Sequence, residues 1–492
     1  MLATVMNSLD TTIANVALPH IQGSVSASSD QITWVLTSYI VSAAIMTPLS
    51  GWLADRLGRK TVFLLSIGGF TAASMLCGIA SSLPEIVIFR LLQGVAGAAL
   101  IPLSQAVLLD IYPKEQHGQA MAIWGAGALL GPILGPALGG YLTEDFSWRW
   151  CFYINLPVGI LAFLGVLIFI SGDRVARAKP FDFLGFGMLS LFVASMQLML
   201  DRGPSQDWFS SMEITTYAIL AAITGWVFVA HTLTAEHPFF DRRLARDRNF
   251  VTASVFGFFV GVLLFSTMAL LPPMLQVLMG YPVLTSGLVT MPRGLGSFLA
   301  MFFVGRLIGR VDTRAILLFG LGLNALALYQ MMHFDLSMGT GAVIVSGIIQ
   351  GFGIGFLFVP LSTLAFATVP PVLRPEGSSL YTLVRNMGSA IGISMMQALV
   401  VSNTQVVHSS LASHLNPSDP VVRDGLPAAM NPTTVAGASA LNAEISRQAS
   451  MVAYVDDFRL MFFITLACVP MLLLMRSPKR EASGEPLHAV VD

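Results

Sequence analysis

The chain has 492 residues, of which 55% are hydrophobic and 11% are Asp, Glu, Lys or Arg. Soluble globular proteins carry roughly 25% charged residues, so this composition and a mean hydropathy of +0.74 exclude that class. Apolar runs long enough to cross a bilayer recur along the chain, which predicts an all-α polytopic membrane protein embedded in lipid. The net charge of −1 identifies no partner, and we expect no nucleic acid.

The cysteines and the sequence motifs give no indication of a metal site, a cofactor or ATP hydrolysis. Cys77, Cys151 and Cys468 lie in or beside apolar runs without paired spacing. They predict neither a disulfide framework nor a zinc site, and we expect no metal and no cofactor. The chain also lacks the GxxxxGK[ST] pattern of a nucleotide-binding loop, which argues against ATP hydrolysis.

Fourteen spans are predicted. An N-terminal six-helix bundle (1–172) contains spans near 1–22, 32–53, 61–81, 85–107, 118–141 and 151–171. An inserted helix pair (183–232) contains spans near 183–200 and 212–232. A C-terminal six-helix bundle (250–476) contains spans near 250–271, 284–308, 315–334, 339–364, 377–401 and 458–476.

Two charges lie inside spans of the first bundle. Asp10 is at the middle of the first span, and Arg90 lies several residues inside the fourth. A charge within a bilayer costs about 2.5–3.5 kcal/mol on insertion scales, so such residues usually have a partner and a function. We predict that Asp10 carries a proton and that Arg90 tunes its protonation. The alternative is that Asp10 only makes structural hydrogen bonds.

The first span starts at Met1 and therefore has no flanking segment before it. Either this helix is short or the natural start lies upstream, and we favour the second explanation.

The loop between the second and third spans reads GWLADRLGRK over 51–60. Gly58 permits a tight turn, and Asp55 is positioned to meet an arginine or a helix N-terminus of the other bundle. We predict a latch that breaks when the bundles move. It would comprise Gly51, Asp55, Arg56, Gly58, Arg59 and Lys60. The alternative is an ordinary basic loop.

The fifth predicted span, at 118–141, has small residues spaced four apart and no charge. On a helix this spacing makes a narrow groove against which a second helix packs closely. The residues concerned are Gly127, Gly131, Gly135, Pro136, Gly139 and Gly140. On the glycines alone, ordinary tight helix packing is the favoured explanation, and a functional role rests on the motifs elsewhere in the chain.

The second half carries Arg293 and Arg385 inside spans. These arginines either line a substrate cavity or cap backbone carbonyls near Pro292 and Gly388. Gln93 of the first half is a third candidate cavity residue.

The outer segment 402–457 is polar and contains Asn-Pro and Asp-Pro turn signals. Its residues 438–454 are predicted to form an amphipathic helix. The segment is either a solvated connector or a docking surface for a periplasmic partner.

The chain also repeats itself. LLQG at 91–94 with PLS at 102–104 corresponds to IIQG at 348–351 with PLS at 360–362. The offset of 257 to 258 residues indicates two related bundles on either side of the insert. Repeated halves around a central site are typical of secondary transporters.

Several of these stretches resemble a known family. The 51–60 loop is similar to the cytoplasmic signature of the major facilitator superfamily, and RLLQGVAG at 90–97 resembles its fourth-helix motif. The glycines at 131–140 resemble the antiporter motif of its fifth helix. LDTTIANVALP at 9–19 resembles the first-helix motif of the fourteen-helix drug/proton antiporters. The second half departs from the signature, since Gly309 stands where the first half has Asp55.

Three further stretches resemble the EmrB-like permeases of that family. They are 102–105, 148–157 and 200–209. The resemblance implies a major facilitator fold in the inner membrane of a bacterium, and proton-driven export of hydrophobic or amphipathic drugs. It also implies a membrane-fusion adaptor and an outer-membrane channel as partners.

Three alternatives stay open. One is a dedicated exporter of a single metabolite or siderophore. Another is a polytopic membrane enzyme, although HExxH and similar catalytic spacings are absent from the sequence. The third is a sensor without transport.

The basic residues predict the topology. With both termini in the cytoplasm, 18 of the 26 Lys and Arg fall on the cytoplasmic face. Reporter fusions should therefore find the termini and 174–179 in the cytoplasm and 402–457 outside. A fusion that reports residue 425 in the cytoplasm would overturn this topology.

Overall fold

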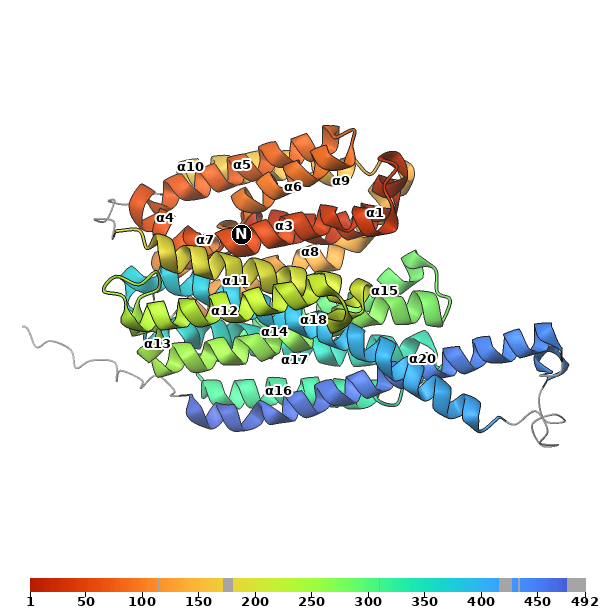
Figure 1. The fold of residues 1–492 in the computed structure, drawn as a ribbon. Helices are drawn as coiled ribbons and strands as arrows, with labels where there is room; N and C mark the ends of the chain where they lie inside the picture. The colour runs from red at the N-terminus through yellow and green to blue at the C-terminus, as the bar shows by residue number, and fades with distance from the viewer. Residues whose placement is uncertain (114–115, 171–179, 309, 416–426, 432–433, 476–492) are drawn as a thin grey trace, which may run out of the picture.

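The computed structural model describes all residues except 114–115, 171–179, 309, 416–426, 432–433 and 476–492 (Figure 1). Its regular elements are helices, and within these described residues the only β-type pairing is an isolated bridge between Ile308 and Val311. This is expected for a chain in lipid, because a helix satisfies its own backbone hydrogen bonds.

The first bundle contains α1 (Leu2–Ser24) and a bent span of α3 (Trp34–Met46) and α4 (Leu49–Leu57). It continues with α5 (Arg59–Ile79), α6 (Leu83–Gly97), α7 (Leu100–Ile111), α8 (His117–Asp145), α9 (Trp150–Tyr153) and α10 (Asn155–Phe169). The bend between α3 and α4 is 55°. It falls at Pro48, whose ring removes a backbone donor and disfavours a straight helix.

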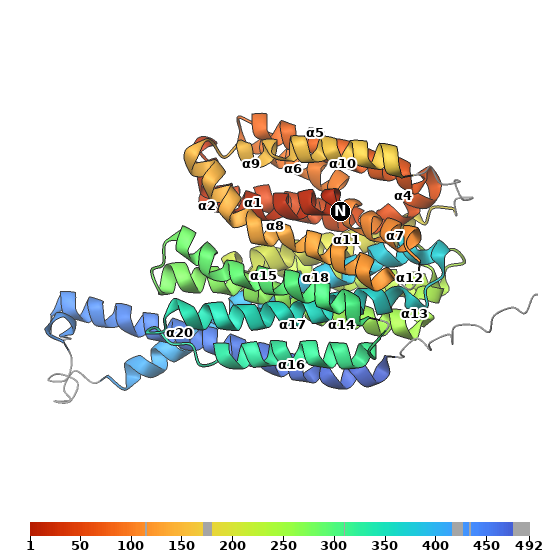
Figure 2. The same ribbon diagram turned by 180° about the vertical axis from the view of Figure 1, so that it is seen from behind.

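The second bundle contains α14 (Arg248–Pro273), α15 (Val283–Leu307), α16 (Thr313–Met331), α17 (Thr340–Ala367), α18 (Arg374–Ser413) and α20 (Val435–Ala467). The tightest packing in this bundle joins α15 to α17, α14 to α18 and α16 to α17. Seen from behind, α8 of the first bundle lies against α15 of the second (Figure 2). The two bundles and the inserted pair make the expected major facilitator architecture.

The insert consists of α11 (Phe183–Arg202) and α12 (Met212–Thr234), which pack on each other at the periphery. It touches both bundles. Ser394 Oγ of α18 donates to Leu200 O at 2.7 Å, and Thr37 of α3 bonds to Asp201. The pair therefore covers one side of the junction between α3 and α18.

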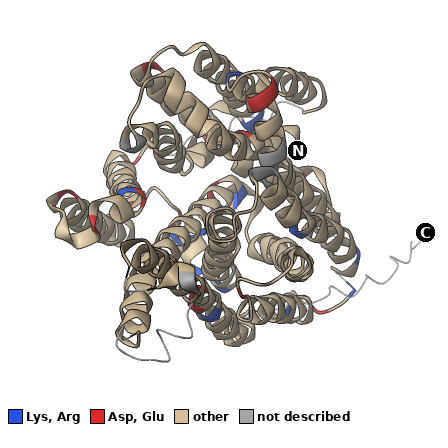
Figure 3. Cartoon of the chain, turned by 90° about the vertical axis from the view of Figure 1, so that its right-hand side faces the viewer, with Lys and Arg blue, Asp and Glu red and all other residues tan. Residues whose placement is uncertain are grey.

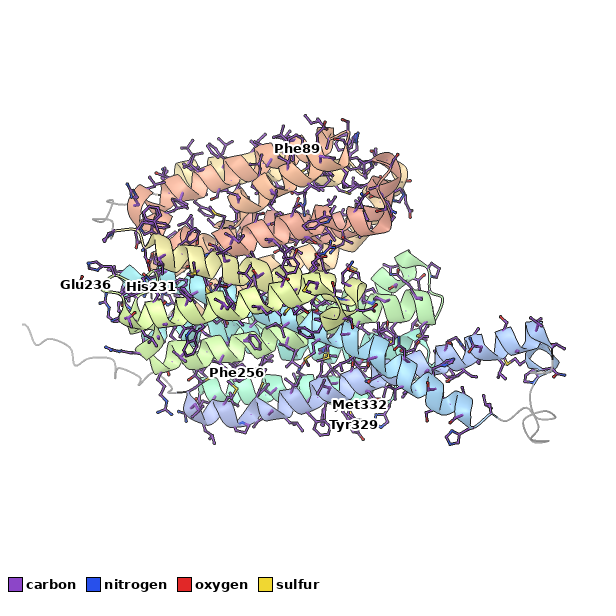
Figure 4. All side chains as sticks on the ribbon, viewed as in Figure 1. Phe89, His231, Glu236, Phe256, Tyr329 and Met332 are labelled. Atoms are coloured by element: carbon purple, nitrogen blue, oxygen red, sulfur yellow. The ribbon has the colours of Figure 1, made fainter. Side chains whose placement is uncertain are left out.

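The two ends of the molecule differ. α4 and α5 meet at Gly58, and α18 begins at Arg374; we call this the basic end. Figure 4 shows His231 and Glu236 at this same end. At the opposite end α18 and α20 extend beyond the other helices, and we call it the hairpin end (Figure 1).

The outer segment is more helical than its turn signals suggested. α18 is 40 residues long and continues to Ser413, and α20 begins at Val435. The helix expected over 438–454 is present, and it is continuous with the last span. Residues 416–426, between these two helices, lie outside the described residues.

In the described part of the chain, twelve helical segments are long and apolar enough to span a membrane, or thirteen if α3 and α4 form one span. α1 has 23 residues but is not among them. Counting α1 gives the fourteen predicted spans, so the structure is compatible with that number. Seen along the helices from the hairpin end, most of the ribbon is uncharged (Figure 3).

The small-residue face of α8 packs against α1. A Cβ added at Gly131 would lie 2.3 Å from the carbonyl carbon of Ser8, and one at Gly135 would lie 2.0 Å from Thr12 Oγ1. Thr12 Oγ1 also donates to Gly131 O at 3.0 Å. The second helix expected in the groove is therefore α1, the helix that carries Asp10.

We expect Gly131→Val to lower the free energy of unfolding by about 1–3 kcal/mol, because the added methyl groups overlap α1. The midpoint of thermal unfolding in detergent, followed by tryptophan fluorescence, measures this. Gly140→Val is the matched control, since an added Cβ at Gly140 meets nothing within 4 Å. Equal midpoints for the two variants would contradict close packing of α1 on α8.

Candidate functional site

Asp10 lies inside the first bundle, with 1% of its surface exposed. Arg90 Nη1 of α6 donates to its Oδ2 at 2.7 Å. Gln93 Nε2 of α6 and Asn155 Nδ2 of α10 each donate to its Oδ1 at 2.8 Å. The carboxylate of α1 is thus bound by three donors from two other helices.

Arg90 is equally buried, at 1% exposure. Its Nε donates to Val35 O of α3 at 3.1 Å, and its Nη1 also donates to Gln93 Oε1 at 2.8 Å. The guanidinium lies 4.3 Å from the ring centroid of Tyr39. This contact adds a cation–π attraction that is strongest where water is excluded.

A second layer of polar groups orients Asn155. Its Nδ2 donates to Ser74 Oγ of α5 at 2.9 Å, and Ser74 Oγ donates to Phe152 O at 2.9 Å. The site therefore joins α1, α3, α5, α6 and α10 through hydrogen bonds. Breaking a buried ion pair on one side costs about 3–5 kcal/mol, so a change in the charge of Asp10 is felt by several helices at once.

The expected proximity of Asp10 and Arg90 is present, while the roles assigned to them remain predictions. Gln93, expected as a cavity residue, is fully buried and bonds to Asp10. Asn155 and Ser74 were not among the predicted site residues. A lone amide in the apolar run after Cys151 was the available signal for Asn155.

The repeat places a different group at the equivalent position of the second bundle. Gln350 of α17 corresponds to Gln93, and its Nε2 donates to Thr267 Oγ1 at 3.3 Å. Thr267 lies 257 residues after Asp10, the same offset that separates the two glutamines. The second bundle therefore keeps the hydrogen bond but has no acid there.

At the basic end, Asp110 of α7 joins the two bundles. It pairs with Arg59 of α5 and accepts from Arg374 Nη1 of α18 at 3.0 Å. Arg374 Nη1 also donates to Leu109 O at 2.9 Å. Ser378 Oγ, one turn further along α18, donates to Gln105 Oε1 of α7 at 2.9 Å. The bundles are thus held together at this end.

The predicted latch residues surround these contacts. A Cβ added at Gly51 of α4 would lie 2.9 Å from Glu376 Cα, so α4 packs closely on the start of α18. Asp55 lines a pocket with Trp52, Pro180 and Glu376. The N-terminus of α18 is therefore beside the signature loop, as the prediction requires.

The remaining latch residues act within the first bundle. Gly58 has φ of +83°, a left-handed conformation that favours glycine at the turn between α4 and α5. Arg56 lies over the ring of Trp52 at 5.0 Å, and Lys60 Nζ donates to Leu167 O at 2.8 Å. Asp110 and Arg374 were not among the residues predicted from the sequence to form the latch. Gly309 lies outside the described residues.

A family model described as "Major Facilitator Superfamily" matches residues 1–393. The chain belongs to the major facilitator superfamily. Its family and fold are those of a transporter rather than an enzyme.

Curated relatives extend this match. The multidrug export protein EmrB of Escherichia coli (strain K12) is 36% identical over 421 residues, which cover 85% of this chain and 82% of EmrB. The fatty acid resistance protein FarB of Neisseria gonorrhoeae is 32% identical over 98% of this chain and 96% of its own length. A multidrug resistance protein B homolog of Mycobacterium tuberculosis (strain ATCC 25618 / H37Rv) is 30% identical over 98% of this chain and 89% of its own length.

Solved structures share the major facilitator fold at lower identity. The human organic anion transporter MFSD10 has a TM-score of 0.59 at 16% identity, covering 94% of this chain and 97% of its own. The proton:xylose symporter XylE has a TM-score of 0.57 at 13% identity, covering 95% of this chain and 94% of its own.

The two buried arginines of the second bundle have different surroundings. Arg293 of α15 donates through Nη2 to Leu264 O at 3.1 Å, which fits the carbonyl-capping alternative. Arg385 of α18 lies 5.3 Å from the ring centroid of Phe358. Its Nε is buried without a hydrogen-bond partner.

We expect Asp110→Asn to favour opening of the basic end, because it removes the charge that attracts Arg59 and Arg374. A partly exposed network of this kind is worth about 1 kcal/mol, or roughly a fivefold change in the open-to-closed ratio. Spin labels at Leu57→Cys and Val372→Cys, both exposed, report the distance between the bundles.

Glu85→Gln is the matched control, since Glu85 accepts from Ser81 at the start of α6, towards the other end. An unchanged distance distribution in Asp110→Asn would show that these ion pairs do not hold the basic end closed.

Proposed function

We propose that this chain is a proton-coupled exporter of hydrophobic or amphipathic compounds that works by alternating access. The observation that carries the proposal is the buried Asp10–Arg90 pair at 2.7 Å inside a major facilitator fold. Relatives named multidrug export protein EmrB and multidrug resistance protein B homolog support the substrate class.

The Asp10 network suits proton exchange. With Asp10 ionised, three donors hold the carboxylate and Arg90 has its counter-ion. A proton on Asp10 removes that counter-ion and weakens the contacts of α1 with α6 and α10. Because Arg90 also bonds to Val35 O, the change reaches α3, whose continuation α4 packs on α18 at the basic end.

Proton entry supplies the driving force. One charge crossing the membrane contributes about 2.3 kcal/mol per 100 mV, in addition to any pH gradient. That is enough to change the balance between two states of the bundles, since the contacts at Asp110 are each worth about 1 kcal/mol or less.

The proposed setting is the inner membrane of a bacterium, with both termini in the cytoplasm. The hairpin end would then be outside, where α18 and α20 extend from the membrane. In this setting the hairpin is the surface that a membrane-fusion adaptor would contact, and the adaptor would pass substrate to an outer-membrane channel.

A dedicated exporter of one metabolite is the second candidate. It is favoured by the relative named fatty acid resistance protein FarB, which covers 98% of this chain. Transport of a compound panel by purified protein separates a broad pump from a dedicated one.

We expect Asp10→Asn to fold and to lose transport driven by a pH gradient, because it keeps the shape of the side chain and removes its proton site. Proton-driven uptake into inverted vesicles at matched expression measures this. Asp10→Glu should retain part of the activity, since it keeps a titratable group.

Asp335→Asn is the control, because Asp335 is exposed and bonds to Ser337 in a loop. Full gradient-driven transport by Asp10→Asn would show that the coupling site is elsewhere.

A further inference from the structure

Four arginines are buried in the described part of the chain, and one of them has no oxygen acceptor. Arg90 and Arg374 pair with carboxylates, and Arg293 donates to a backbone carbonyl. Arg385 has 8% of its surface exposed. Its side chain lies against the ring of Phe358 and interacts electrostatically with Tyr381, one turn earlier on α18, without a hydrogen bond between them. Its Nε is buried without a hydrogen-bond partner.

Such an arrangement is unfavourable unless it serves a ligand. A cation–π contact contributes about 0.5–2 kcal/mol, whereas an unpaired charge at membrane depth costs about 2.5–3.5 kcal/mol or more. A bound anion would supply the missing counter-charge. The structural alternative is an arginine that only stacks on Phe358.

The position of Arg385 on α18 is set by helix geometry. Arg374 and Ser378 contact α7 and close the basic end. Arg385 follows Ser378 by seven residues, which is two helical turns and a rise of roughly 10 Å, so it lies on the same face. It therefore faces the first bundle just beyond the closed contact, towards the hairpin end.

Aromatic rings from both bundles meet beside this charge. Phe358 of α17 stacks on Trp124 of α8, with centroids 5.8 Å apart and planes at 17°. The indole N–H of Trp124 donates to Ser104 Oγ at 2.8 Å, which fixes the ring. The charge thus adjoins a flat apolar wall that is held in place.

We propose that Arg385 binds the acidic headgroup of an amphipathic organic anion, whose apolar body lies against Phe358 and Trp124. The inference rests on the proposed export function and specifies its substrate class. Arg385 attracts a carboxylate or sulfonate and repels a cation, and the aromatic rings accept a flat or aliphatic body. Selectivity for anions then comes from one side chain.

The test compares acids with a neutral analogue of the same size. Full-length protein is placed in nanodiscs of phosphatidylcholine, which contain no anionic lipid. Its equilibrium affinity is measured for radiolabelled 2-naphthoate, 2-naphthalenesulfonate and 2-naphthamide. Wild type should prefer at least one acid to the amide. Arg385→Gln should reduce that preference roughly ten- to hundredfold, the range for a lost charge-assisted hydrogen bond.

Two variants serve as references. Arg385→Lys keeps the charge and should keep part of the preference. Arg447→Gln removes an exposed arginine paired with Glu444 and should leave the preference unchanged. If Arg385→Gln is not recovered as folded protein, Arg385→Met carries the same comparison.

Thermal unfolding separates a ligand-binding arginine from a structural one. Neither Arg385→Gln nor Arg385→Met leaves a buried acid unpaired, so neither should lower the unfolding midpoint. A lowered midpoint with an unchanged acid preference would assign Arg385 a structural role and overturn the proposal.

Equal affinity of wild type for the acids and the amide would also overturn it. In that case, proton-driven transport of a neutral compound by wild type would still support the proposed export function. If wild type transported no compound at all, the proposed export function would also be wrong.

Discussion

Asp10 and Arg90 form an ion pair in a place where water is excluded, and the packing of the first bundle is arranged around it. Each charge alone would be too costly to keep inside a bilayer. Together they require a second set of groups, from Gln93, Asn155 and Val35, to satisfy the remaining donors and acceptors. Helices α1, α3, α6 and α10 must therefore keep a fixed register with one another.

The close contact of α8 with α1 serves the same arrangement. Glycines at 131 and 135 allow the two backbones to approach so closely that added Cβ atoms would overlap Ser8 and Thr12. These residues flank Asp10 along α1. The small residues of α8 thus hold α1, the helix that carries Asp10, in place. The proposed proton coupling through Asp10 therefore depends on this close packing.

The two bundles share a fold but differ in their buried charges. The first bundle pairs its arginine with an acid, whereas the second has Thr267 at the matching place and two arginines with no acid partner among the described residues. This division suits a transporter in which one half handles the proton and the other handles the substrate. At the basic end, the two halves are joined by contacts at Asp110 and Gln105.

Much of this protein follows from local sequence. The apolar runs determine the spans, the repeat at 91–104 and 348–362 indicates two related bundles, and the cost of burying a charge singles out Asp10 and Arg90. Spacing of glycines on 118–141 predicts a tightly packed helix. The spans, the buried charges and the glycine spacing depend on residues close together in the chain, and the repeat is found by comparing two stretches of sequence. None of them requires knowledge of the fold.

Other features were decided only by the tertiary structure, because they depend on which side chains meet across distant segments. Asp110 contacts Arg374, 264 residues away, and Asn155 reaches Asp10 across 145 residues. The local pattern shows an acid at a span end and a lone amide in an apolar run, but it does not show which distant side chains they contact. Arg293 and Arg385 likewise look equivalent in sequence, and only packing gives one a carbonyl and leaves the other without an oxygen acceptor.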